Sequence, residues 1–397
     1  MDLTWSEEDI AFRQEAKQYL EQNIPDSFPE DPAEDFASKR AFQRKLADDG
    51  WVAIHWPTEY GGRGASIMQT VIYNEEYSRA GGPSLPNSLG IGLLGPTLMA
   101  YGTEEQKDRY LKKVLTAEEV WCQGFSEPNS GSDLASLQCR AELDGDEFVV
   151  NGQKIWTSYG AYADWMFALV RTDSTGVKHA GITFLLIDMH SPGIEVRPLK
   201  EMTGEALFSE VFFTDVRVPV GHVVGEVGGG WRVAMSTLMF ERGAGGLAQS
   251  VMLRNSVDRL IEDAQRLRRN GWTAFDDPIA RQMIGKNLVE IEVYRYTTLR
   301  AISAIAAGSA PGAEASINKL YWSEWHKSFT NDAMSILGPH GRWAAQGSAG
   351  IDSDRWMREF LFARAGTIYA GTSEIQRNIL AERVLGLPKE PSGKGDA

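Results

Sequence analysis

The chain is poor in the residues that build disulfide scaffolds and zinc sites. Only two of its 397 residues are cysteines, Cys122 and Cys139, and they do not form a Cys-x-x-Cys pair. The six histidines are dispersed, without the short spacing that metal ligands need. We therefore expect no disulfide framework and no metal centre.

Long apolar runs and an excess of positive charge are also missing. The longest apolar stretches, such as 182–187 and 301–307, fall far short of the roughly 20 residues that span a bilayer. With 40 Lys and Arg against 54 Asp and Glu, the net charge is −14, which disfavours binding to nucleic acid or to an anionic membrane. The N-terminal residues are acidic and show no apolar signal region. These absences predict a cytoplasmic protein with no membrane span and no nucleic-acid partner.

Several widespread catalytic motifs are absent as well. The chain has no GxGxxG after a strand, no GxxxxGK[ST], no HExxH and no GxSxG. A Rossmann nicotinamide enzyme, a P-loop enzyme and a zinc hydrolase are therefore disfavoured. What remains is a chain of ordinary globular composition, 43% hydrophobic and 24% charged, and of a length that suggests two or three domains.

The pattern along the chain runs from helices to strands and back to helices. Helical spacing dominates up to about residue 118, and β-rich runs then alternate without a helix-length pattern between them. The dipeptides Asp144-Gly145 and Asn151-Gly152 predict hairpin turns between these strands. We expect strands at 147–150, 154–158, 165–171, 181–188 and 211–218, and helices at 232–269, 278–307, 312–337 and 373–385. The prediction is a helical domain at 1–118, an antiparallel β domain at 119–229, a helical domain at 230–387 and a disordered tail at 388–397.

Three segments carry candidate chemistry, each with an ordinary structural alternative. The segment CQGFSEPNSGSD, residues 122–133, could offer backbone N–H groups to an anion or a ring edge, or it could be a surface loop. In NGQKIWTS, residues 151–158, Trp156 and Ser158 are expected on one face and could stack on a planar cofactor, or the Trp could belong to the core. In TIYAGTSEIQR, residues 367–377, the free N–H groups of a helix start could hold a phosphate or a carbonyl, or Thr372 or Ser373 could be a plain cap.

These segments, with four others, match a known family in order along the chain. The matching landmarks are WPTEYGGRG (56–64), YGTEEQK (101–107), FSEPNSGSD (125–133), NGQKIWTS (151–158), VFFTDVRVP (211–219), FERG (240–243) and IYAGTSEIQR (368–377). The chain resembles the acyl-CoA dehydrogenases over essentially its whole length. The resemblance implies a helical N-terminal domain, a middle β domain and a C-terminal four-helix domain, with FAD bound between the β and helical domains, usually in a tetramer.

The resemblance also implies roles for individual residues. Those at flavin-contacting positions are Gln123, Phe125, Ser126, Gly131, Ser132, Trp156, Thr157 and Ser158. Thr372 and Glu374 would meet the adenosine diphosphate half of FAD, from a neighbouring subunit. Acyl-CoA-contacting positions fall at Ser132, Arg242 and Gly371.

The expected catalytic base is not where many members carry it. In those members a Glu immediately precedes the Gly-Thr-Ser segment, but here that residue is Ala370, whose methyl group cannot take a proton. The isovaleryl and long-chain types place the base on an earlier helix, just before an Arg, and that position here is Glu241. We therefore predict Glu241 as the base. Ala370 keeps its backbone N–H, which we expect to hold the thioester oxygen.

The segments that hold the FAD diphosphate in many relatives also differ. The Arg of an RxxFG segment is missing from WTAFDDP, and the QxxGGxG segment reads SILGPHG, with Ser335 for Gln and Pro339 for Gly. Proline has no N–H to donate. The prediction is an FAD-dependent acyl-CoA dehydrogenase that forms a trans-2-enoyl-CoA, passes electrons to an electron-transfer flavoprotein and assembles as a homotetramer or as a heterotetramer with a related subunit. The alternatives are a non-catalytic or half-site subunit and a flavin oxidase or monooxygenase of the same fold.

Overall fold

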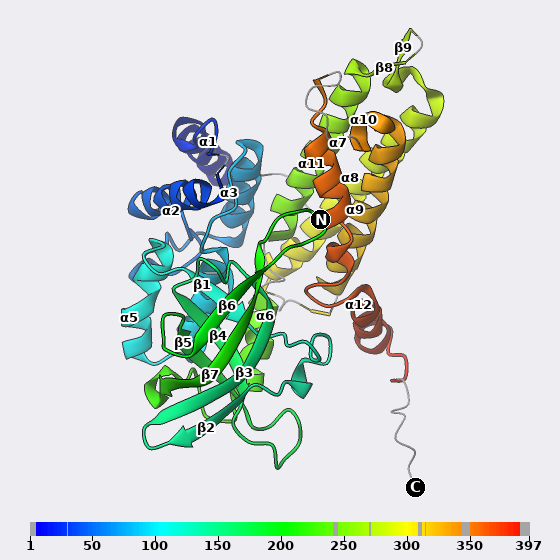
Figure 1. Ribbon diagram of the computed structural model, residues 1–397. Coiled ribbons are helices and arrows are strands. Elements are labelled where there is room, and N and C mark those ends of the chain that lie inside the picture. The colour runs from blue at the N-terminus through cyan, green and yellow to red at the C-terminus, as the bar shows by residue number, and fades with distance from the viewer. Residues whose placement is uncertain are drawn as a thin grey trace. The chain divides into compact units, whose positions relative to one another are not determined.

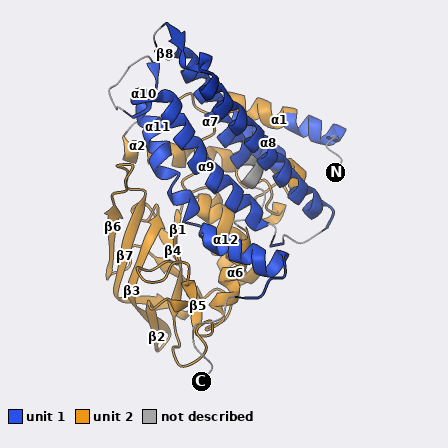
Figure 2. Cartoon of the chain, turned by 90° about the vertical axis from the view of Figure 1, so that its right-hand side faces the viewer, with its two compact units in different colours: residues 1–13, 71–79, 244–397 blue, residues 14–70, 80–243 orange. Residues whose placement is uncertain are grey.

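The computed structural model describes residues 5–29, 31–240, 245–269, 271–308, 312–313, 315–342 and 350–389. The chain divides into two compact units (Figure 2). Unit 1 comprises residues 1–13, 71–79 and 244–397, and unit 2 comprises residues 14–70 and 80–243. Unit 2 is therefore built from the middle of the chain, and unit 1 from both of its ends and one short internal segment.

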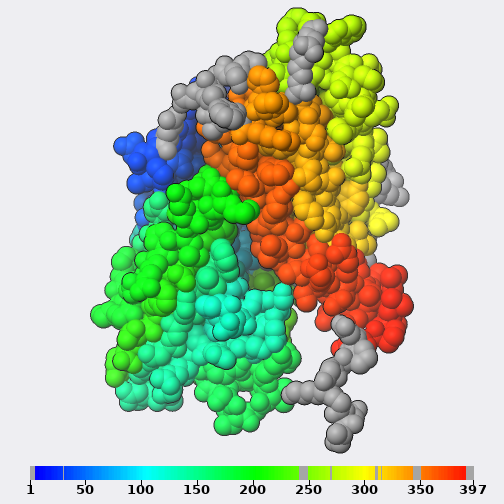
Figure 3. Space-filling model, turned by 45° about the vertical axis from the view of Figure 1, so that its right-hand side comes forward, coloured from blue at the N-terminus to red at the C-terminus, as the bar shows by residue number. Residues whose placement is uncertain are grey.

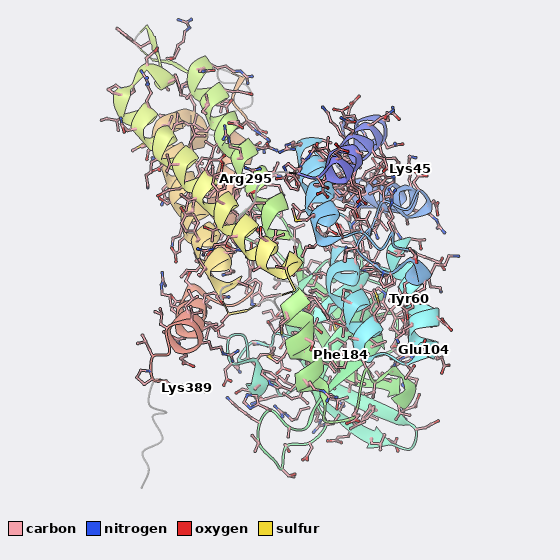
Figure 4. All side chains as sticks on the ribbon, turned by 180° about the vertical axis from the view of Figure 1, so that it is seen from behind. Lys45, Tyr60, Glu104, Phe184, Arg295 and Lys389 are labelled. Carbon is pink, nitrogen blue, oxygen red and sulfur yellow. The ribbon has the colours of Figure 1, made fainter. Side chains whose placement is uncertain are left out.

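Unit 2 is centred on a seven-stranded sheet. Its strands are β1 (Trp121–Gly124), β2 (Arg140–Asp144), β3 (Glu147–Ser158), β4 (Trp165–Arg171), β5 (Ile182–Asp188), β6 (Ile194–Leu199) and β7 (Phe208–Pro219). They are ordered β1-β4-β2-β3-β7-β6, with β5 on the other edge of β4 (Figure 1). β4 and β5 are almost continuously apolar because both faces of each strand are covered, and Phe184 of β5 is fully buried (Figure 4).

The predicted β domain is confirmed, and most of its neighbouring strands are antiparallel. β1 and β4 run parallel, which strand patterning could not reveal. A parallel pair needs a long crossover connection, and here β2 and β3 lie in that connection. The turn at Asp144-Gly145 is also confirmed, because it joins the antiparallel strands β2 and β3.

The predicted hairpin at Asn151-Gly152 is wrong. β3 continues through these residues, and its register with β7 shifts between Val150 and Gly152. Gly152 has φ +147°, and a Cβ atom there would lie 2.7 Å from the Cα of Cys139. The glycine is therefore needed for a β-bulge where two backbones approach closely, rather than for a turn.

Helices complete unit 2. They are the greater part of α1 (Glu7–Asn23), α2 (Pro32–Asp48), α4 (Gly95–Tyr101), α5 (Glu104–Leu115) and α6 (Gly230–Phe240). α5 starts with a capping box, in which Thr103 and Gln106 each bond the other's backbone N–H. α6 ends one residue before Glu241, and residues 241–244 lie outside the described part of the chain. The predicted helix 232–269 covers α6 and α7 (Gly245–Arg266), which lie on either side of these undescribed residues.

Unit 1 is helical. Its helices are α3 (Ile67–Arg79, from residue 71), α7 (Gly245–Arg266), α8 (Pro278–Ala306), α9 (Ala315–Leu337), α10 (Pro339–Arg342), α11 (Ser353–Phe362) and α12 (Ser373–Ile379). α7, α8, α9 and α11 lie alongside one another around a core that includes Leu260, Phe329 and Trp356 (Figure 1). A short hairpin of β8 (Arg268–Arg269) and β9 (Trp272–Thr273) follows α7.

The predicted order of helical, β and helical regions is confirmed. α8 and α9 agree with the predicted helices to within a few residues, whereas α11 was not predicted. The domain boundaries after residues 118 and 229 stay a prediction. Of the predicted disordered tail, residues 390–397 lie outside the described residues.

Candidate functional site

The segment of residues 123–132 leaves the sheet at the end of β1. Phe125 is buried, with its ring edge-on to Phe167 and Phe184 at centroid distances of 5.9 and 6.0 Å. The carbonyl oxygen of Ser126 accepts a hydrogen bond from Ile155 N–H at 3.0 Å, which brings the segment against β3. The Ser126 N–H has no acceptor among the described residues. This donor is available to a bound group.

The end of β3 lies beside this segment. The β3–β7 register shifts again between Lys154 and Thr157, and Trp156 has φ +59°, a conformation that is uncommon for a bulky residue. Trp156 is 59% exposed, so it is not a core residue. The bulge breaks the alternation that placed Trp156 and Ser158 on one face, since Lys154 and Thr157, three residues apart, are both buried.

The predicted flavin residues of unit 2 fall into two groups. The first group is the segment with Gln123, Phe125 and Ser126 together with the end of β3, which carries Trp156, Thr157 and Ser158. The hydrogen bond from Ile155 N–H to the Ser126 carbonyl joins these two segments. Gly131 and Ser132 are exposed and lie beyond the Glu127–Ser130 turn, and within the described chain no hydrogen bond joins them to residues 156–158. The Ser126–Ile155 bond therefore links the two segments that carry six of these eight positions.

In unit 1, Ala370 and Gly371 both have left-handed backbone conformations, with φ of +52° and +84°. The φ of +84° at position 371 favours glycine, and a Cβ there would also lie 2.5 Å from the Nε2 atom of the Gln376 side chain. The same Nε2 donates to the carbonyl oxygen of Ala370 at 3.0 Å. The Ala370 N–H has no acceptor among the described residues, which leaves it free to donate to a ligand.

Thr372 and Glu374 start α12. The Thr372 side chain accepts from Ile375 N–H at 3.2 Å, so it is the N-cap of this helix. The Glu374 carboxylate accepts hydrogen bonds from the backbone N–H of Glu374 and from the Thr372 hydroxyl. These bonds hold the pKa of Glu374 below its usual value. Both predicted cofactor residues are thus part of one cap, and Figure 3 shows α12 at the surface. The cap alternative is confirmed for Thr372, and it is compatible with a binding role.

The sequence prediction missed the residues that anchor this helix. Glu324 of α9 accepts a hydrogen bond from the Ser373 hydroxyl at 2.7 Å, and its other carboxylate oxygen pairs with Lys327 at 2.8 Å. Gln376 was missed too, although it occurs within the quoted TSEIQR segment. Only tertiary proximity identifies Glu324, because it lies 49 residues before Ser373.

Two predicted residues cannot be placed. Glu241 and Arg242 lie outside the described residues. The last described residues before them, Met239 and Phe240, end α6 and are both exposed.

The two segments that differ from the diphosphate motifs meet in unit 1. They line a cavity of about 600 Å³ whose lining residues include Thr273, Asp276, Asp277 and Ser335 but no Lys or Arg. The Ser335 hydroxyl donates to the carbonyl of Asn331 at 3.0 Å, and Asp276 accepts from Thr273, so these groups already have partners. Arg281 and Arg268 lie close enough to Asp276 to help lower its pKa, but the carboxylates that line the cavity are a poor match for a diphosphate.

Comparison with known proteins decides the family. Models of the acyl-CoA dehydrogenase N-terminal, middle and C-terminal domains match residues 6–118, 122–216 and 228–385. The chain belongs to the acyl-CoA dehydrogenase family. Members of this family are FAD-dependent flavoproteins, and the cofactor of this acyl-CoA dehydrogenase is FAD.

Similar proteins cover nearly the whole length of this acyl-CoA dehydrogenase. "Acyl-CoA dehydrogenase IpdE1" of Mycobacterium tuberculosis is 42% identical over 390 residues, which is 96% of this chain and 98% of the relative. The structure of the "ChsE4-ChsE5 complex from Mycobacterium tuberculosis" has a TM-score of 0.86 at 31% identity, over 98% of this chain and 100% of the other. That of the "Tcur3481-Tcur3483 steroid ACAD" has a TM-score of 0.86 at 30% identity, with the same coverage.

The residues of unit 2 fit the ring system of this cofactor. The free Ser126 N–H, the exposed Trp156 indole and the Ser158 hydroxyl, which has no partner among the described residues, provide a stacking surface and polar groups for a planar heterocycle. Within the described part of the chain, no helix is long and apolar enough to cross a membrane, and no three His, Cys, Asp or Glu side chains cluster as metal ligands.

Proposed function

We propose that this acyl-CoA dehydrogenase removes hydrogen from the α and β carbons of an acyl-CoA thioester and forms the trans-2-enoyl-CoA. One observation carries most weight: Ala370 presents an unpartnered backbone N–H while its carbonyl is held by Gln376. The bond from Gln376 fixes the Ala370–Gly371 peptide, which adjoins the Tyr369–Ala370 peptide that carries this N–H. A preorganised N–H can stabilise the negative charge that develops on a thioester oxygen.

We propose Glu241 as the base that takes the α proton. A methyl side chain at position 370 cannot act as a base, and FERG supplies a carboxylate at the position used by the isovaleryl and long-chain types. Proton abstraction needs only one positioned carboxylate if the thioester oxygen is stabilised at the same time. The residues around Ser126 and Trp156 would hold FAD, which would supply the acceptor for the hydride of the β carbon. The same FERG and Gly-Thr-Ser pair argues against an oxidase or monooxygenase of this fold.

The proposed substrate carries a branched or ring-bearing acyl group. Alanine at position 370 occupies less volume than the Glu of many members, and the preceding residues Ile368 and Tyr369 expose apolar surface, Ile368 to 65%. A similar structure is described as a steroid ACAD, which agrees with a bulky acyl group. Ser132, Arg242 and Gly371 are the proposed acyl-CoA contacts.

The proposed assembly is a tetramer, cytoplasmic, that passes electrons to an electron-transfer flavoprotein. Val289, Val293 and Tyr296 of α8 are exposed and line an open cavity of about 430 Å³, an apolar surface of the kind that interfaces cover. The cavity at Asp276 and Asp277, whose lining is poorly suited to the diphosphate of a neighbour's FAD, supports a heterotetramer over a homotetramer. Relatives of similar structure are named as pairs of chains, such as ChsE4-ChsE5.

The same cavity favours one second candidate, a half-site subunit that shares a single FAD with its partner. The two candidates differ in what the purified chain contains. A yellow protein that is bleached without oxygen by an acyl-CoA supports the dehydrogenase; a colourless chain that gains flavin only with a partner supports the half-site subunit.

The base is tested by Glu241→Gln in the assembled enzyme. This variant should bind FAD and acyl-CoA normally, yet the flavin absorbance should persist when branched, straight-chain and steroid-type acyl-CoA esters are added. The double variant Glu241→Gln, Ala370→Glu places a carboxylate where many members carry it and should restore part of the bleaching. Near-normal turnover of Glu241→Gln would contradict the assignment.

A further inference from the structure

A buried ion pair joins β3 to the segment of residues 123–132. The Lys154 ammonium is 2.7 Å from Glu127 Oε1, and the side chains of Lys154 and Glu127 are 0% and 8% exposed. Burying two charges costs several kcal/mol per ion before pairing, and replacing such a pair by apolar residues is often neutral or stabilising. Fold stability alone therefore gives a weak reason for a lysine at this position of β3.

The carboxylate of Glu127 holds the two ends of the loop that follows. It accepts from the N–H groups of Gln138 and Cys139 at 2.6 and 2.9 Å, eleven and twelve residues further along the chain. The backbone of Glu127 also exchanges two 3.0 Å hydrogen bonds with Ser130. Glu127 is thus fixed on its backbone and side chain alike, and it gives Lys154 a rigid partner.

Lys154 has a second acceptor, the carbonyl oxygen of Phe125, at 3.2 Å from its Nζ atom. The next residue of β3, Ile155, donates to the carbonyl of Ser126 at 3.0 Å. In a trans peptide the C=O of one residue and the N–H of the next point in opposite directions. The bond from Lys154 therefore turns the Ser126 N–H away from the ammonium, and this N–H has no protein acceptor among the described residues.

We propose that Lys154 is a positioning residue for the flavin: through the carbonyl of Phe125 it orients and polarises the Phe125–Ser126 peptide, so that the Ser126 N–H is presented to the flavin as a strengthened donor. A cation on a peptide oxygen draws electron density from the N–H, and consecutive hydrogen bonds strengthen one another in a buried environment. Glu127 supplies the counter-charge that keeps Lys154 in place. The inference rests on the proposed flavin contacts of residues 123–132.

The experiment compares three changes in the full-length, assembled protein. Lys154→Met removes the ammonium but keeps the length of the side chain, Lys154→Arg keeps the positive charge, and Lys113→Met removes another lysine of unit 2 that pairs with an acid, Glu119, at 3.0 Å. Since Lys154→Met leaves Glu127 buried without its cation, the double variant Glu127→Gln, Lys154→Met provides a neutral alternative that is easier to fold. The measured quantities are the FAD dissociation constant of the apoprotein, the visible spectrum of bound FAD and its midpoint potential.

We expect Lys154→Met and the double variant to bind FAD at least about tenfold more weakly, as loss of a charge-assisted hydrogen bond implies. The midpoint potential should become more negative, because a weaker donor stabilises the electron-rich reduced flavin less. Lys154→Arg should recover part of both effects, and Lys113→Met should change neither. Wild-type affinity, spectrum and potential in the double variant would overturn the proposal.

Trp156→Phe and Ser158→Ala separate this inference from the flavin site on which it rests. If these two variants perturb the flavin spectrum and the Lys154 variants do not, the role of Lys154 is wrong and the site stands. If none of these variants perturbs the flavin spectrum, the flavin does not bind at this end of β3.

Discussion

The side-chain amide of Gln376 donates a hydrogen bond to the carbonyl oxygen of Ala370 at 3.0 Å, across the turn that precedes α12. Gln376 is buried, and its Oε1 atom has no partner among the described residues. The amide therefore serves mainly to fix the Ala370–Gly371 peptide, which has left-handed conformations on both sides. This bond connects the first turn of a helix to the residue whose N–H is proposed to bind the thioester oxygen.

Gln376→Leu should lower kcat/KM about five- to tenfold while changing the free energy of unfolding by less than about 1 kcal/mol. The lost hydrogen bond is worth roughly 1 kcal/mol, but the substitution also removes the unpaired Oε1 atom, which offsets part of the loss of stability. Steady-state kinetics and thermal unfolding measure the two effects. Gln43→Leu is the control: its amide donates to the carbonyls of Val114 and Leu115, so stability should fall and kcat/KM should not.

Ala370→Gly and Ala370→Pro should have opposite effects. The left-handed conformation costs an alanine roughly 1–2 kcal/mol, and glycine avoids this cost, so Ala370→Gly should be more stable. It should also remain active, because glycine keeps the backbone N–H. Proline removes the N–H and locks φ near −65°, so activity should be abolished. Unfolding midpoints and acyl-CoA bleaching test both variants. An active Ala370→Pro enzyme would exclude the proposed donor.

Trp156→Phe should weaken FAD binding without destabilising the apoprotein. The indole is 59% exposed, and substitutions of exposed residues usually change stability by no more than about 0.5 kcal/mol. A smaller ring gives a smaller stacking surface, so we expect an increase of about tenfold in the FAD dissociation constant and a changed flavin spectrum. Trp272→Phe, at another exposed indole, should leave both unchanged. Equal FAD affinity in the two variants would contradict a stacking role.

Gly152→Ala should destabilise the sheet of unit 2 by about 2–3 kcal/mol. The added Cβ would lie 2.7 Å from a backbone atom of Cys139, and the backbone conformation of residue 152 is itself unfavourable for alanine. Gly145→Ala is a matched control, because Gly145 also has a positive φ, +67°, but no described atom would lie within 4 Å of a methyl group added there. Gly145→Ala should lower the free energy of unfolding by only about 1–2 kcal/mol. Denaturant unfolding of both variants measures the difference.

Acid should weaken the anchorage of α12 through Glu324. The pKa of Glu324 lies below its usual value, mainly because of the hydrogen bond from Lys327, with smaller contributions from Ser373 and Arg377. The folded state therefore favours the ionised carboxylate. This contribution to stability is complete above the unfolded pKa of about 4.3 and is lost as the pH falls through the lower pKa of the folded state. Glu324→Gln should therefore be less stable at pH 7 and show a shallower decline in unfolding midpoint between pH 5 and about 3. Parallel profiles of the two proteins would contradict the linkage.

The candidate site separates what residue types can predict from what depends on tertiary packing. The segments around Phe125, Trp156 and Thr372 were located from residue types and family resemblance. The conformations within them were not, because Asn151-Gly152 has the same local preference in a hairpin and in a bulge. The bulge forms instead of the hairpin because Cys139 approaches closely and β3 pairs with β7. Neither contact can be predicted from the residues next to Asn151 and Gly152 in the sequence.

The sequence alone determined the order of helical and β regions, the capping box at Thr103, the lack of a carboxylate at position 370 and the family. These follow from local spacing, side-chain chemistry and ordered motifs. The tertiary structure alone decided the exposure of Trp156, the bond between Gln376 and Ala370, and the burial of Lys154 beside the segment that presents Ser126. Such features depend on which distant segments share a buried, low-dielectric environment, where each polar group must find a partner, and that depends on how the whole chain packs.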